Sequence, residues 1–174
     1  MRWLARLARA LPSLIMRPLI QPFCLALAAL SLSLGLPLTA QAQQQLAGRV
    51  KRLSGTVSVE RAGKTLALEP GSPLFQGDRI RTGRDGYAGI TLVDDTLLTA
   101  GPGSLLVLSR FAFNATTQEG ELQAALPHGS LQVVSGLIAK KSPEKVQFKG
   151  RNVVLGVRGT EFILEVPAEV GEDE

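Results

Sequence analysis

The chain has 174 residues and a formal net charge of +4, but the charge is unevenly distributed. Residues 1–42 contain four arginines and no acidic residue, whereas residues 43–174 contain 15 basic and 15 acidic side chains. The larger part is therefore neutral overall, which argues against a nucleic-acid-binding surface. It also lacks cysteine, which excludes disulfides and thiol chemistry there.

The N-terminal segment has the three parts of a secretory signal peptide. Arginines precede an apolar stretch at 23–38, and small residues lead to a cleavage site that ends at Ala42. We therefore expect residues 1–42 to be removed during export to the periplasm, which leaves a polar lead at 43–47. Met16, just before the apolar part, is a candidate for the true translation start. The alternative is an uncleaved membrane anchor, because the apolar stretch, when counted from Pro18, is nearly as long as the roughly 20 residues that a span requires.

Residues 48–166 alternate apolar and polar side chains in short runs separated by turns. A period of two is typical of strands, and closely spaced turns are typical of sandwiches, barrels and rolls. We expect one all-β domain of many short strands, arranged as a β-roll or solenoid-like stack or as a sandwich. Residues 167–174 hold four acidic and no basic residues, so we expect a solvated acidic tail. In chain order, strands are expected at 56–60, 65–68, 79–82, 87–93, 96–99, 104–109, 122–126, 131–134, 146–148, 153–155 and 160–166.

The sequence offers no recognisable catalytic set. His128 is the single histidine, in a Pro-His-Gly turn, and no nucleophile elbow accompanies it. After residue 42, one histidine and no cysteine are too few for the usual nitrogen and sulfur ligands of a metal site. Adjacent residues at the end of a strand point to opposite faces, so the carboxylates of Asp94 and Asp95 are not expected to act together at one site. We expect both residues in a solvated turn. We therefore expect no catalytic residue, no metal and no cofactor, and a protein that is not an enzyme.

A basic cluster surrounds the segment Ser142-Pro143-Glu144. One interpretation is that lysines on an exposed loop and strand edge protect the domain against aggregation. The other is a patch for an acidic partner, such as an anionic polymer of the cell envelope or an acidic protein surface. The members of this basic patch are Lys140, Lys141, Lys145, Lys149 and Arg151.

Four segments, in this order, resemble the FecR domain family. They are residues 55–59, the stretch L-x-x-G-D-x-I-x-T-G at 74–83, residues 86–90, and residues 156–162 with the closing R-G-T-E-F. The resemblance extends over 48–166. It implies a periplasmic all-β module, which in the best-known members belongs to a membrane-spanning regulator of iron uptake with a cytoplasmic sigma-factor-binding part. Too few residues precede the apolar stretch here for such a part, so we expect only the periplasmic module to carry over.

The motif residues are expected to be structural. Gly77 and Asp78 suit a tight turn in which the carboxylate accepts backbone N–H groups. Gly159 allows a bulge or a close approach of another strand. Arg158 is expected to have a carboxylate partner, with Asp78 and Glu161 as candidates. The full set of motif residues is Gly77, Asp78, Arg158, Gly159, Thr160, Glu161 and Phe162.

These observations predict a non-enzymatic periplasmic FecR-domain protein that acts as an interaction, signalling or scaffolding module of the cell envelope. Its partner is expected to be another envelope protein. The alternative is a cell-wall or polysaccharide-binding module that uses the basic patch. Contact with a membrane is expected only if the signal peptide remains uncleaved.

Overall fold

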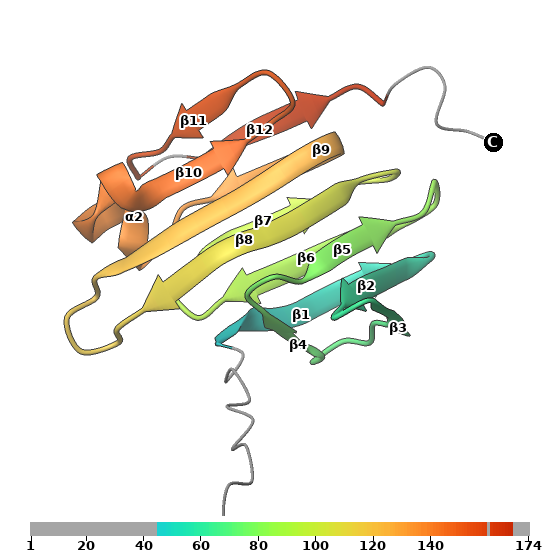
Figure 1. Cartoon of the computed structure of the whole chain (residues 1–174), viewed down its shortest axis with the longest axis horizontal. Coiled ribbons are helices and arrows are strands. Elements are labelled where there is room, and N and C mark those ends of the chain that lie inside the picture. Colours follow the sequence, from blue (N-terminus) through green and yellow to red (C-terminus); the bar gives the residue numbers. More distant parts are fainter. Residues whose placement is uncertain (1–44, 160, 169–174) are drawn as a thin grey trace, which may run out of the picture. The chain divides into compact units, whose positions relative to one another are not determined.

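The structure, a computed structural model, describes residues 45–159 and 161–168, and this part is almost entirely β (Figure 1). The all-β prediction is confirmed. The expected signal peptide, Thr160 and most of the expected acidic tail lie outside the described residues. The strands are β1 (Leu46–Ser54), β2 (Val57–Arg61), β3 (Lys64–Ala67), β4 (Pro73–Phe75), β5 (Arg79–Thr82), β6 (Tyr87–Leu92), β7 (Leu97–Ala100), β8 (Leu105–Phe113), β9 (Gly120–Val134), β10 (Val146–Lys149), β11 (Val154–Gly156) and β12 (Glu161–Val166), with a short helix α2 (Leu137–Lys141) and a 3-10 turn η1 (Pro143–Lys145) before β10.

The strands form one curled sheet whose two halves share β9. The main order is β3-β2-β5-β8-β9-β7-β6-β1-β4, and β10 and β12 pair with β9 beside this path. Most neighbours are antiparallel, whereas β9 and β10 run parallel. Figure 1 shows β2, β5 and β8 in one layer, with β1, β6 and β7 in the layer behind it. Each half therefore covers the inner face of the other.

Strand β9 passes from one half of the sheet to the other near Gly129. Its first part pairs with β8 and β10, and its last part pairs with β7 and β12. Buried positions are even-numbered from Leu122 to Leu126 and odd-numbered from Leu131 to Val133. Because strand side chains alternate between faces, this change of parity keeps the apolar side on the core in both halves. The sequence predicted two strands here, whereas the structure has one strand of 15 residues with a bend in it.

Small side chains hold the bend of β9 in place. Gly129 has a φ of 97°, a conformation that glycine adopts without strain, and a Cβ there would meet Ser104. The Ser104 hydroxyl accepts a hydrogen bond from the Ser130 amide at 2.9 Å. The Thr82 hydroxyl accepts one from the Ser104 amide at 2.8 Å and donates one to the Gly101 carbonyl at 2.6 Å. These contacts tie β5 and the β7–β8 turn to the point where β9 changes partners.

The core lies between the two halves of the sheet. Val59, Ile80 and Leu106 contribute from one half, and Ile90 and Leu98 contribute from the other, all at most 2% exposed. At the β10 and β12 end, Phe148 and Phe162 make an edge-to-face contact with ring centres 5.3 Å apart. Apolar burial of this kind is the main stabilising contribution to such a domain.

Strands β1 and β4, helix α2 and the 3-10 turn η1 were missed because their patterns are irregular or short. Strand β1 contains a bulge between Val50 and Arg52, which interrupts the alternation that identifies a strand. Helix α2 has five residues, too few to show a helical period. Ser142, expected in an exposed loop, is instead 5% exposed directly after this helix. Among the residues that the structure describes, no helix has the length and apolar character needed to cross a membrane.

Candidate functional site

The aspartate of the G-D motif is a buried anchor in the β4–β5 turn. Gly77 takes a φ of 90°, and Asp78 follows it with no solvent exposure. The carboxylate accepts a hydrogen bond from the Phe75 amide at 2.8 Å and one each from Nε and Nη2 of Arg61 at 2.7 Å. This two-point geometry between a guanidinium and a carboxylate is the strong form of an ion pair. The arginine comes from β2, so the contact fastens β2 to the β4–β5 turn.

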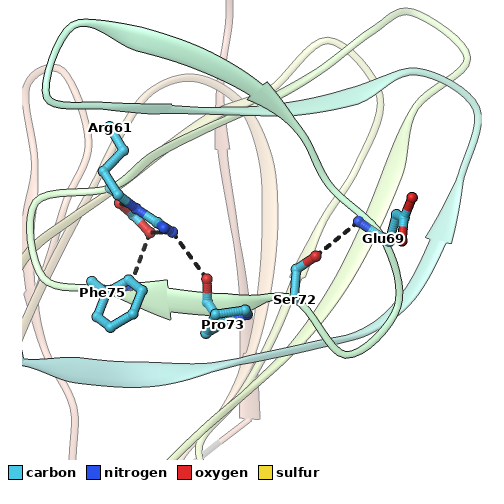
Figure 2. A network of polar contacts seen from close by, with 6 residues as sticks. Arg61, Glu69, Ser72, Pro73 and Phe75 are labelled. Carbon is cyan, nitrogen blue, oxygen red and sulfur yellow. Dashed lines mark hydrogen bonds and ion pairs between the residues drawn. The ribbon is translucent and has the colours of Figure 1, made fainter.

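The remaining faces of the Arg61 guanidinium are also occupied. Its Nη2 donates to the Pro73 carbonyl at 2.9 Å, and its central carbon lies 4.5 Å from the centre of the Phe75 ring. Figure 2 shows the guanidinium between these residues, beside the turn in which the Glu69 amide donates to the Ser72 hydroxyl. The hydrogen bond to Asp78 raises the pKa of Arg61 against the opposing effect of burial. The cluster is thus a structural contact in which Nε and Nη2 of Arg61 and both oxygens of Asp78 are engaged within the fold.

The R-G-T-E-F motif leads into β12. Arg158 is exposed, and Gly159 has a φ of 60°. Asp78, a candidate partner of Arg158, is instead paired with Arg61, which corrects that expectation. Glu161, the other candidate, accepts a hydrogen bond from Gln132 at 2.7 Å. Arg158 also takes no part in an ion pair within residues 45–159 and 161–168.

The two halves of the family motif therefore lie at separate places. Asp78 fastens the β4–β5 turn, whereas Phe162 packs against Phe148 at the β10 and β12 end. No hydrogen bond or ion pair joins the two groups in the described part of the chain. The motif residues that the structure describes do not assemble into a single site.

The basic patch follows three consecutive elements. Lys140 and Lys141 lie in the last turn of α2, where positive charge is favourable next to the helix C-terminus. Lys145 ends η1, and Lys149 ends β10. Strand β10 lies between β9 and β11, so Lys149 is not on an edge strand, which corrects the edge-protection interpretation at this position. All four lysines and Arg151 are exposed, and Arg151 already makes a contact of its own.

Asp94 is a buried residue that the sequence placed in a solvated turn. It has no solvent exposure, whereas Asp95 beside it is exposed with a φ of 65°. The Asp94 carboxylate accepts hydrogen bonds from the Thr96 hydroxyl at 2.7 Å, the Thr96 amide at 3.2 Å and the Ile138 amide at 3.4 Å. Its backbone carbonyl accepts the Leu137 amide at 2.8 Å. Asp94 therefore attaches the first turn of α2 to the β6–β7 turn.

His128 and the surface depressions define no catalytic arrangement. Nδ1 of His128 lies 2.9 Å from the Gly103 carbonyl, which fits a hydrogen bond between the bend of β9 and the β7–β8 turn. One depression, of about 500 Å³, lies between the β8–β9 connection and Lys145. Another, of about 360 Å³, lies between the β10–β11 turn and the end of β12. Within residues 45–159 and 161–168, no three His, Cys, Asp or Glu side chains gather as metal ligands.

The fold and its turns define a small all-β module built around a buried G-D turn and a closing strand. The FecR protein family matches residues 78–172, which is more than half of the chain. The chain belongs to this family. The matched range begins at Asp78, after the segments at 55–59 and 74–77 that also contributed to the resemblance.

Comparison with other known proteins adds little to this assignment. No curated protein matches the chain. One solved structure, described as a cell surface anchoring domain, is 32% identical over 35% of this chain and 82% of its own, with a TM-score of 0.34. A likeness of that extent carries no argument about fold or function.

Proposed function

We propose that this protein is an exported, non-enzymatic FecR-family module that binds another protein of the cell envelope. One observation carries the proposal most directly. The two buried carboxylates of the G-D motif and of the acidic turn, Asp78 and Asp94, are engaged in contacts that hold the fold together. The side chains left for recognition are those on exposed strands and edges. Family membership supports the same conclusion.

Site-specific photo-crosslinking in cells that produce the full chain tests this function. A photoreactive residue would replace Leu66, Tyr87 or Ile163, which are 45%, 40% and 64% exposed on three different strands. We expect at least one position to give a discrete adduct with a single envelope protein. Adducts at no position, together with salt-sensitive sedimentation of the protein with isolated cell wall, would contradict the proposal and support the wall-binding alternative.

Export is part of the same proposal. We propose that residues 1–42 are a signal peptide cleaved after Ala42, on the grounds of the arginines, the apolar stretch and the small residues at the site. The intact mass of the protein from the periplasmic fraction should correspond to a chain that begins at Gln43. A mass that retains the apolar stretch would instead indicate a membrane anchor.

A further inference from the structure

Strand β12 is an edge of the curled sheet. It pairs with β9 along its whole length, from Glu161 opposite Val134 to Val166 opposite Gly129. Within residues 45–159 and 161–168, no other strand pairs with it. An edge strand presents every second N–H and C=O group away from its neighbour, and such groups readily accept another strand.

The outward side chains of β12 have a definite pattern. Glu161, Ile163 and Glu165 are exposed, whereas Leu164 and Val166 face the core. Ile163 is 64% exposed, the highest value among the large apolar residues that the structure describes as exposed. An added strand would lie beside a row of acidic, apolar and acidic side chains, with Phe162 half-buried on the inner face.

This pattern opposes pairing between two copies of the chain. In an antiparallel pair centred on Ile163, Glu161 of one copy would lie opposite Glu165 of the other, on both sides of the centre. An in-register parallel pair would align identical carboxylates. Like charges directly opposite each other destabilise a strand pair, so the arrangement disfavours self-association at β12. Opposite charges at the same positions would instead stabilise it.

We propose that β12 is the docking edge for an extended segment of the partner protein that carries basic residues four positions apart, with β-branched or apolar residues between them. Backbone hydrogen bonds provide the affinity, and the pairing of lysine or arginine with Glu161 and Glu165 selects the partner. The apolar residue between the two charges would lie against Ile163, and its neighbours would cover Phe162. This inference rests on the proposed protein-binding function and specifies where it acts.

A capped peptide, Ser-Lys-Val-Val-Val-Lys-Ser, is the probe, and its central valine lies on the same face as the two lysines. Its dissociation constant for the purified protein is compared with that of the same peptide carrying glutamine in place of both lysines. Two opposite-charge cross-strand pairs predict binding about two- to thirty-fold tighter for the lysine peptide. Backbone amide resonances of residues 161–166 should shift on titration. Methylation of alternate backbone nitrogens in the peptide should abolish binding, because it removes the hydrogen-bond donors.

Two double variants with the same change in net charge distinguish pairing of the peptide at β12 from general attraction of the peptide to the acidic surface of the protein. The double variant Glu161→Gln with Glu165→Gln should remove the preference for lysine. The control variant Glu119→Gln with Glu144→Gln changes the net charge equally at two other exposed positions, and it should keep the preference. Equal loss in both variants, binding that survives methylation, or shifts confined to residues outside β12 would overturn the proposal. Specific protein adducts from other faces, without any of these peptide effects, would leave the protein-binding function standing and refute only this edge.

Discussion

Removal of the Asp78 carboxylate is the sharpest test of the buried anchor. Asp78→Ala deletes the acceptor of three hydrogen bonds, two from Arg61 at 2.7 Å and one from the Phe75 amide at 2.8 Å. Breaking a buried ion pair by removing one partner costs about 3–5 kcal/mol, because the other charge stays behind unpaired. The Arg61 side chain is 20% exposed and keeps the Pro73 carbonyl, so we expect the lower end, about 3 kcal/mol.

Thermal unfolding followed by circular dichroism measures this effect. For a domain of this size about 3 kcal/mol corresponds to a fall in melting temperature of roughly 10 °C. The exposed pair Glu60–Arg79, at 3.4 Å and with side chains 44% and 45% exposed, is the matched control. Glu60→Ala should change the free energy of unfolding by less than about 1 kcal/mol.

A second substitution tests whether the unpaired charge of Arg61 causes the loss of stability in Asp78→Ala. Arg61→Met in the Asp78→Ala background removes the unpaired guanidinium, so the double variant should be more stable than Asp78→Ala alone. A raised pKa means that the charge of Arg61 contributes at every pH below the usual arginine range and is lost only above it. In the protein that retains Asp78, the effect of Arg61→Met on the free energy of unfolding should therefore be the same at neutral and at moderately alkaline pH. Two results would contradict the role of Asp78 as a buried anchor. One is a melting temperature of Asp78→Ala equal to that of Glu60→Ala. The other is a double variant whose loss of stability is the sum of the losses caused by Asp78→Ala and Arg61→Met separately.

Three further substitutions test other contacts by the same melting assay. Asp94→Ala should cost about 2 kcal/mol, because it leaves buried donors of α2 and the β6–β7 turn unpaired, whereas the exposed Asp95→Asn should be near neutral. Gly129→Ala should lower the free energy of unfolding by more than about 2 kcal/mol, since the new Cβ would meet the backbone of Ser104. Gly103 also has a positive φ but open space around it, so Gly103→Ala should lower the free energy of unfolding by only about 1 kcal/mol. Arg158→Ala should change stability by less than about 0.5 kcal/mol because the side chain is exposed, and a loss comparable to that of Asp78→Ala would restore the structural interpretation of this residue.

The sequence predicted the strands that are half-buried and regular. In β5, β6 and β7, buried residues alternate without interruption with exposed or half-buried ones, and all three strands were expected within one residue of their bounds. Apolar residues recur with a period of two because one face of each of these strands packs on the core. Where the backbone departs from regular strand geometry, as at the bulge of β1, the alternation of apolar and polar residues is interrupted. The short β4 (Pro73–Phe75) has too few residues to show a period at all.

Long-range partners could not be predicted by the same means. Asp78 was identified as a turn residue, but nothing local selects Arg61, 17 positions away, among the basic residues of the chain. The burial of Asp94 depends on α2, whose amide at Ile138 is 44 positions away. The bend in β9 has the Pro-His-Gly composition of an ordinary turn, and only the second half of the sheet makes it a continuous strand. Local patterns report local geometry, whereas these features depend on which strands become neighbours.

The division between interior and edge decides how function in this protein must be tested. Within the described residues, every buried side-chain nitrogen and oxygen has a hydrogen-bond partner. Substitutions at Asp78 or Asp94 therefore act on the fold first, and any loss of binding they cause follows from that. Glu165 and Ile163 on β12 face solvent, so their replacement changes the surface and leaves the core packing intact. A binding defect with an unchanged melting temperature is accordingly informative at β12, and the same defect at the buried motif is not.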